Sequence, residues 1–126
     1  MRLLTHNMLK CNVKGVMNGY PLNIEATEVA VEETDFNDEF VVRMIGKLEW
    51  GAFLQAAKQV SGLTEIPELP AELNQDIMAD EDFLKAVHHV LLEVKVVEGA
   101  LVCPESGRSF PVTKGIPNML LNEDEV

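Results

Sequence analysis

Two cysteines and three histidines are the residues of this 126-residue chain that could carry nucleophilic or metal chemistry. A catalytic thiol needs a base, and Cys103 could pair with His88 or His89 from elsewhere in the chain. No local signature of a cysteine enzyme surrounds Cys103, and the simpler interpretation is a small core residue beside a turn. A small Cys/His-dependent hydrolase or redox enzyme that uses Cys103 is therefore the alternative hypothesis.

The same residues offer too few ligands for a structural metal site. Zinc in such sites is bound by four side chains, mostly Cys or His, and Cys11 and Cys103 supply two. His6, His88 and His89 would complete the set only by coincidence of folding, and neighbouring side chains on a helix point about 100° apart. The sequence therefore predicts no metal site.

Glycine-rich loops that cradle phosphate groups are absent. Neither GxGxxG nor GxxxxGK[ST] occurs, so the chain carries no recognisable motif for a nucleotide or for S-adenosylmethionine. Most carboxylates fall on the polar sides of expected helices, where a solvated acidic face is the ordinary role. We therefore expect no bound cofactor.

Charge is distributed unevenly along the chain, whose formal net charge is −11. Residues 34–93 carry 4 basic and 12 acidic residues, while residues 1–33 and 94–126 are close to neutral. An acidic surface repels phosphate, which argues against an RNA-binding module. The two apolar, nearly neutral ends are better suited to contact with another protein.

Residues 1–33 are expected to form strands. Over residues 3–9, Leu3, Thr5, Asn7 and Leu9 alternate with the residues between them, a period of two that is typical of a strand. After glycine turns, a second strand is expected from about residue 22 to residue 31.

Residues 34–93 are expected to form helices. Asn37 is a candidate N-cap, and the apolar positions that follow change sides between Gly46 and Gly51, which predicts two short helices instead of one. Residues 63–79 are expected to be a loop. Asp80 is a candidate N-cap for a third helix with a clean apolar stripe.

Residues 94–126 return to the strand pattern. A β-branched run over residues 95–102, a turn, and a second run over residues 108–113 predict a hairpin. Residues 116–121 are then apolar and extended. Such a strand at a sheet edge either pairs with a partner protein or is buried under this chain's own helices, and the sequence leaves both readings open.

The order of these blocks predicts an α+β fold. Residues 1–33 and 94–126 would build one small sheet module from both ends of the chain. Residues 34–93 would form a helical insertion packed beside it.

Several stretches also resemble a known family over nearly the whole chain. These stretches are residues 1–9, Phe36-Asn37, Phe40, Glu49-Trp50, residues 88–94, Glu98-Gly99, residues 103–108 and residues 115–121. On them the sequence resembles the eukaryotic tRNA methyltransferase activator subunit, also called the multifunctional methyltransferase subunit.

The resemblance implies a non-catalytic subunit that stabilises and activates S-adenosylmethionine-dependent methyltransferases. Their substrates in this family are tRNA, rRNA and a translation termination factor. Family members form heterodimers with several such enzymes, one at a time, and reach nucleic acid only through the partner. The implied fold is a zinc-ribbon-like module with a helical insertion, and the implied location is cytoplasmic and nuclear, with no membrane contact.

The resemblance also implies a departure at the zinc ligands. Some family members bind zinc with two cysteine pairs, whose positions correspond here to Cys11 and Val16 and to Cys103 and Ser106. Neither Val nor Ser replaces a thiolate in a structural site. We therefore expect no zinc, and we expect Cys11 and Cys103 to lie near each other as reduced thiols.

We assign the partner interface to the two nearly neutral ends of the chain. On an extended C-terminal strand, Asn118 and Leu120 face one way and Met119 and Leu121 the other. One of these rows is expected to pack on the chain's own core and the other on the partner. The predicted interface residues are Thr5, His6, Asn7, Met8, Pro117, Asn118, Met119, Leu120 and Leu121.

Overall fold

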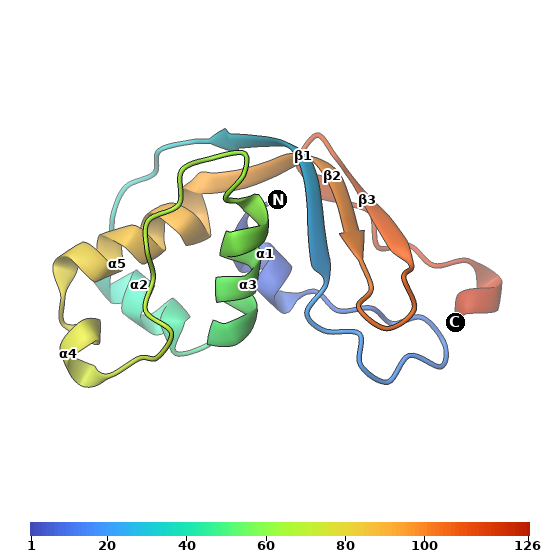
Figure 1. Cartoon of the computed structure of the whole chain (residues 1–126), viewed down its shortest axis with the longest axis horizontal. Coiled ribbons are helices and arrows are strands. Elements are labelled where there is room, and N and C mark those ends of the chain that lie inside the picture. Colours follow the sequence, from blue (N-terminus) through green and yellow to red (C-terminus); the bar gives the residue numbers. More distant parts are fainter.

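One antiparallel sheet is built from both ends of the chain in the computed structural model, which describes all residues from Met1 to Val126 (Figure 1). Its strand order is β1-β2-β3-β4. The strands are β1 (Asn23–Val31), β2 (Val94–Val102), β3 (Ser109–Thr113) and β4 (Ile116–Pro117). The predicted α+β class is confirmed, while the zinc-ribbon-like description stays a prediction.

Most of the helical residues lie between β1 and β2 in the sequence. Figure 1 shows these helices gathered on one side of the molecule and the β2–β3 hairpin on the other. No helix is both long and apolar enough to cross a membrane. The helices are α1 (Leu3–Met8), α2 (Asp38–Ile45), α3 (Trp50–Val60), α4 (Gln75–Met78), α5 (Glu81–His88), the π-helix η1 (His89–Glu93) and the 3-10 helix η2 (Glu123–Glu125).

Local capping explains where the inserted helices begin. The Asn37 side chain accepts a hydrogen bond from the Phe40 N–H at 3.1 Å and starts α2, and the Asp80 carboxylate starts α5. Both predicted caps are confirmed, as is the break between α2 and α3. The loop predicted for residues 63–79 is wrong at its end, because Asn74 caps the Ile77 N–H at 2.8 Å and starts α4.

The strand predicted for residues 3–9 is wrong, because this segment forms α1. Its buried residues are Leu3, His6 and Asn7, at the spacing of one face of a helix. Apolar residues occupy both alternating rows of the segment, and Leu and Met favour helices over strands. Only Arg2 keeps a strand-like contact, an isolated bridge to Lys95 of β2.

The strand predicted for residues 116–121 is shorter than expected. Only Ile116 and Pro117 pair with β3. Pro117 has no N–H to donate, and the Asn118 side chain accepts a hydrogen bond from the Leu120 N–H at 3.1 Å, which competes with strand pairing. The apolar run therefore continues beside β3 as an irregular segment.

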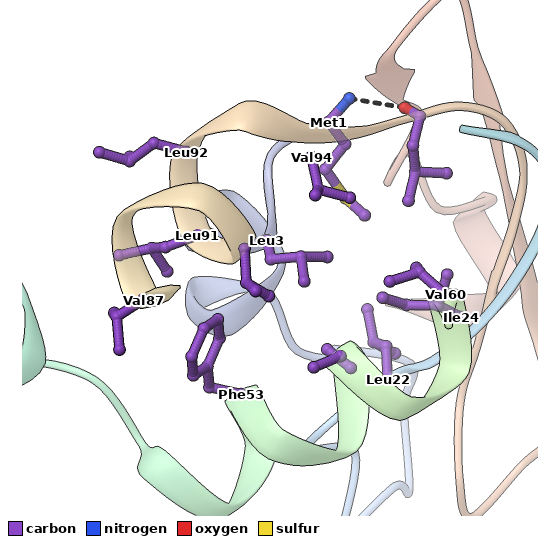
Figure 2. Packing of buried hydrophobic residues seen from close by; sticks show 14 of the residues in the cluster. Met1, Leu3, Leu22, Ile24, Phe53, Val60, Val87, Leu91, Leu92 and Val94 are labelled. Carbon is purple, nitrogen blue, oxygen red and sulfur yellow. Dashed lines mark hydrogen bonds between the residues drawn. The ribbon is translucent and has the colours of Figure 1, made fainter. Parts of the chain in front are cut away.

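The hydrophobic core lies between the sheet and the helices. Figure 2 shows Leu3 of α1, Phe53 and Val60 of α3, and Val94 of β2 converging on one interior. Leu3, Phe53, Val60 and Val94 are fully buried. The Met1 ammonium donates to the Val96 carbonyl at 2.7 Å, as drawn in Figure 2, and fixes α1 against β2.

Candidate partner-binding surface

The two edges of the sheet differ in how they are covered. Helix α3 packs against β1, and the Gln59 side chain accepts a hydrogen bond from the Ile24 N–H of β1 at 2.7 Å. Strand β4 lies at the other edge and has a strand neighbour on one side only, β3. An uncovered edge with apolar side chains is a site where another chain can pair. The β4 edge is therefore the candidate partner-binding edge.

Side chains after the Lys114-Gly115 turn alternate between the core and solvent. Met119 and Leu121 are half-buried and pack against the core. Ile116 and Leu120 point outward and are 69% and 79% exposed, and Asn118 is exposed between them. We call these three outward residues the outer row. An open groove of about 640 Å³ borders them, lined by Pro111, Thr113, Ile116, Pro117, Asn118, Met119 and Leu120.

Ile116 was not among the predicted interface residues. It lies two positions before Asn118 and four before Leu120, so the period of two places it in the same row. This spacing is the signal that would have included it.

The segment that carries the outer row is held at both ends. Near its start, the Asn118 N–H donates to the Pro111 carbonyl of β3 at 2.9 Å. Beyond its end, the Arg108 guanidinium binds the Glu125 carboxylate at 2.6 and 3.1 Å and lowers the pKa of that carboxyl. The Lys14 N–H donates to the Glu125 carbonyl at 2.7 Å. A segment fixed in this way loses little freedom when a partner binds.

The predicted interface residues of the N-terminal segment fall into two groups. Thr5 and Met8 are exposed, Met8 by 62%. His6 and Asn7 are buried, with 1% and 6% of their surface exposed. Their assignment to the partner surface is therefore corrected: both side chains face the interior of this chain.

Hydrogen bonds explain the burial of His6 and Asn7. The Asn7 amide donates to the Glu49 carbonyl and accepts from the Glu49 N–H, each at 3.0 Å, so that α1 is tied to the start of α3. The His6 Nε2 lies 2.7 Å from the Leu22 carbonyl. Burial lowers the pKa of His6, and the Leu22 carbonyl opposes this shift.

Cys11 and Cys103 form a second site, beyond the outer row. Both are buried free thiols, and they lie close enough to affect each other's ionisation. Burial raises the pKa of Cys11. Burial also opposes ionisation of Cys103, but hydrogen bonds from Ser106 and from the backbone of Ser106 and Glu105 lower its pKa to about 7. The predicted proximity of Cys11 and Cys103 is confirmed, while their reduced state in the cell stays a prediction.

The loops that carry these thiols are joined by Glu105. Its carboxylate accepts hydrogen bonds from the Met17 N–H at 2.9 Å and the Asn18 N–H at 3.2 Å. The Ser106 N–H donates to the Cys103 sulfur at 3.3 Å. Sequence reasoning missed the Glu105 bridge because Met17 and Asn18 are distant from Glu105 in the chain. A carboxylate thus holds together the loop of residues 11–19 and the turn of residues 103–108.

The donor set at this site does not fit the zinc ion that the family resemblance implies. Val16 offers no ligand atom, and the Ser106 hydroxyl, which is no thiolate, accepts a hydrogen bond from the Arg108 N–H at 3.3 Å. No group of three or more His, Cys, Asp or Glu side chains is gathered so as to hold a metal ion. The absence of zinc stays a prediction.

The histidines considered as a base for Cys103 are engaged elsewhere. His89 Nδ1 lies 2.8 Å from the Glu93 carboxylate, and His88 Nε2 lies 3.1 Å from the Thr34 hydroxyl. This cluster joins the two ends of the helical insertion. Its arrangement gives no support to a Cys–His catalytic pair.

Fold and surface together define a small α+β protein with an exposed apolar row beside the β4 edge of its sheet. The chain belongs to the family described as Trm112p-like protein, whose model matches residues 2–115. It is 56% identical to the multifunctional methyltransferase subunit TRM112 homolog A of Arabidopsis thaliana, over 100% of both chains. It is 55% identical to the TRM112-like subunit of Mus musculus, over 99% of this chain and 98% of that one.

More distant relatives extend this picture. The TRM112 subunit of Saccharomyces cerevisiae is 32% identical, over 96% of both chains. Among solved structures, a chain of the E. cuniculi Mtq2–Trm112 complex is similar with a TM-score of 0.60, covering 95% of both chains at 19% identity. That complex is described as responsible for methylation of the eRF1 translation termination factor. At this identity the likeness shows a shared fold.

Proposed function

We propose that this chain is a non-catalytic subunit that stabilises and activates S-adenosylmethionine-dependent methyltransferases. Membership of the Trm112p-like family supports this role, as do the names of relatives that the chain matches along its whole length. The enzymes that it activates would modify tRNA, rRNA and a translation termination factor.

The observation that carries the proposal is the outer row on an open sheet edge. Ile116 and Leu120 are large apolar side chains held in solvent by a segment that is anchored at both ends. Strand β4 lies at the edge of the sheet, and the adjacent groove offers space for side chains of the partner. Docking here would bury apolar surface on both proteins, which keeps the catalytic chain soluble and able to bind the methyl donor.

One such surface implies that several catalytic chains compete for it and bind one at a time. Nucleic acid would be reached through the partner, because a net charge of −11 opposes binding of phosphate by this chain alone. Work in both cytoplasm and nucleus would follow from partners that modify RNA and a termination factor. The chain itself would supply neither a methyl-donor site nor a metal.

Co-expression with a catalytic partner tests the proposal. We expect a Mtq2-type methyltransferase to be soluble and active only with this chain. Leu120→Asp should weaken the complex by about 30-fold or more, as for an interface residue worth about 2 kcal/mol. Leu63→Asp is the matched control, because Leu63 is also an exposed leucine, 49% accessible, but lies just after α3.

Two results would contradict this function. One is a catalytic chain that is equally soluble and active without the subunit. The other is calorimetric binding of S-adenosylmethionine to the isolated subunit with a micromolar dissociation constant, because the chain would then hold the cofactor itself. Equal loss of binding in the Leu120 and Leu63 variants would instead reject only the proposed surface.

A further inference from the structure

The buried thiol pair lies outside the residues assigned to the partner-binding surface. Cys11 follows α1 and Cys103 follows β2, so the fold brings together two cysteines from opposite ends of the chain. Cys11 is 5% exposed and Cys103 is 2% exposed. The two thiols lie close enough to affect each other's ionisation, and neither is in a disulfide.

Backbone hydrogen bonds fix the position of both cysteines. The Cys11 N–H donates to the Gly19 carbonyl at 2.9 Å, and the Cys103 N–H donates to the Arg108 carbonyl at 2.9 Å. A Cβ at Gly19 would lie 2.5 Å from the Cys11 carbonyl oxygen, so this loop is as tight as a glycine permits. Together with the Glu105 bridge, these contacts hold the two loops that carry the thiols against each other.

We propose that Cys11 and Cys103 are an oxidation site, at which a peroxide converts the two thiols into an intramolecular disulfide. The disulfide would join the loop of residues 11–19 to the turn of residues 103–108. These are the two loops that Glu105 already connects.

The chemistry is a two-electron oxidation with hydrogen peroxide as the oxidant. The Cys103 sulfur, which accepts the Ser106 N–H, attacks one peroxide oxygen, and the O–O bond breaks. The products are a sulfenic acid on Cys103 and hydroxide, which leaves as water with the thiol proton. The Cys11 sulfur then attacks the Cys103 sulfur, and the S–O bond breaks. The hydroxide that leaves takes the Cys11 proton and forms a second water. Two thiols and one peroxide thus give one disulfide and two waters.

Burial decides which product forms. Glutathione and other large thiols have no path to sulfur atoms that are nearly inaccessible, whereas peroxide is about the size of two waters. The neighbouring thiol is therefore the one available partner for the sulfenic acid. The same burial should make the reaction slower than at an exposed thiol.

The new bond would lie next to the anchor of the outer row. Lys14 of the loop and Arg108 of the turn both bind Glu125, which follows the partner-binding segment. Joining loop and turn would stabilise this anchor. It would also raise the unfolding temperature, because it closes a long loop and restricts the unfolded chain.

Thiol counting on the purified full-length chain tests the proposal. After exposure to hydrogen peroxide, denaturation in an alkylating reagent should label neither cysteine in the monomer. The peptides containing Cys11 and Cys103 should appear joined, with a mass lower by two hydrogen atoms, and dithiothreitol should restore both thiols and the original unfolding temperature. Diamide, which oxidises thiols by two electrons without oxygen transfer, should give the same joined peptides.

Several results would overturn the proposal. One is that both thiols are still labelled at a peroxide dose that has oxidised all methionines. The others are sulfinic acid at Cys103 with Cys11 unchanged, and a disulfide between two chains. The Cys11→Ser variant provides a second readout, because a sulfenic acid on Cys103 should then persist and react with dimedone. If that variant fails to fold, the joined peptides of the natural chain still decide the matter.

Discussion

The two segments predicted to bind the partner, residues 5–8 and residues 117–121, have similar composition but opposite fates. Both are nearly neutral and largely uncharged. In the first, His6 and Asn7 turn inward and bind backbone groups of Leu22 and Glu49, the residues just before β1 and α3. In the second, every other side chain remains in solvent. Low charge therefore indicates a segment that is either buried in this chain or available to a partner. Hydrogen-bonding groups elsewhere in the chain decide whether the segment is buried.

The largest expected effect is on the inward-facing segment. Asn7→Ala removes both hydrogen bonds to Glu49 and leaves the Glu49 N–H without a partner. We expect the free energy of unfolding to fall by about 3 kcal/mol, measured by urea denaturation. Asn12→Ala, at an exposed asparagine in the next loop, should change it by less than about 0.5 kcal/mol. Equal stabilities of the two variants would mean that α1 is not held by Asn7.

Within the outward-facing segment, the neighbouring residues Met119 and Leu120 should differ in their effect on stability. Met119→Asp places a carboxylate against the core and should lower the free energy of unfolding by about 2 kcal/mol. Leu120→Asp alters a side chain that is 79% exposed and should leave the isolated chain within about 0.5 kcal/mol of its original stability. Thermal unfolding followed by circular dichroism measures both. The reverse order would mean that the two rows have been assigned to the wrong sides.

His6 gives the inward-facing segment a pH dependence. The unfolded chain binds a proton at His6 near its ordinary pKa of 6.5, whereas burial lowers the pKa in the folded chain. The folded state therefore binds fewer protons, and its stability should fall as the pH decreases from about 6.5 through the folded pKa, by at most about 1.4 kcal/mol per pH unit. In a His6→Gln variant this part of the slope should be missing when urea denaturation is repeated between pH 7 and pH 5, about the range in which histidine titrates. An unchanged slope would mean that His6 is not the source of the pH dependence.

The smallest expected effect concerns the two loops beside the thiols, which the Glu105 carboxylate joins. Glu105→Gln keeps one acceptor oxygen and loses the charge, so the free energy of unfolding should fall by about 1 kcal/mol or less.

A chelator should leave the unfolding temperature of the natural chain unchanged, and elemental analysis should find well under one zinc per chain. Stoichiometric zinc would contradict the interpretation of this site.

The sequence predicted the elements whose causes are local. Asn37 and Asp80 cap helices through hydrogen bonds within three residues, and the change of apolar face between Gly46 and Gly51 marks a break in one helix. Strand β1 and the β2–β3 hairpin likewise follow from β-branched runs and a turn.

The failures depend on contacts between distant parts of the chain. Helix α1 is stabilised by the Glu49 backbone and the Leu22 carbonyl, neither of which a window of residues 3–9 contains. The same holds for the bridge from Glu105 to Met17. At the outer row the alternation was visible in the sequence, but which row faces the core depends on the position of β3.

Hydrogen–deuterium exchange of the subunit, alone and with a Mtq2-type methyltransferase, tests whether residues 116–121 bind the partner. Amides of residues 116–121, except Pro117, should become strongly protected in the complex. Those of α1 should be protected in both states, because His6 and Asn7 already fix this helix. Protection gained over α2 instead, with residues 116–121 unchanged, would contradict the proposed partner-binding edge and place the interface on the helical insertion.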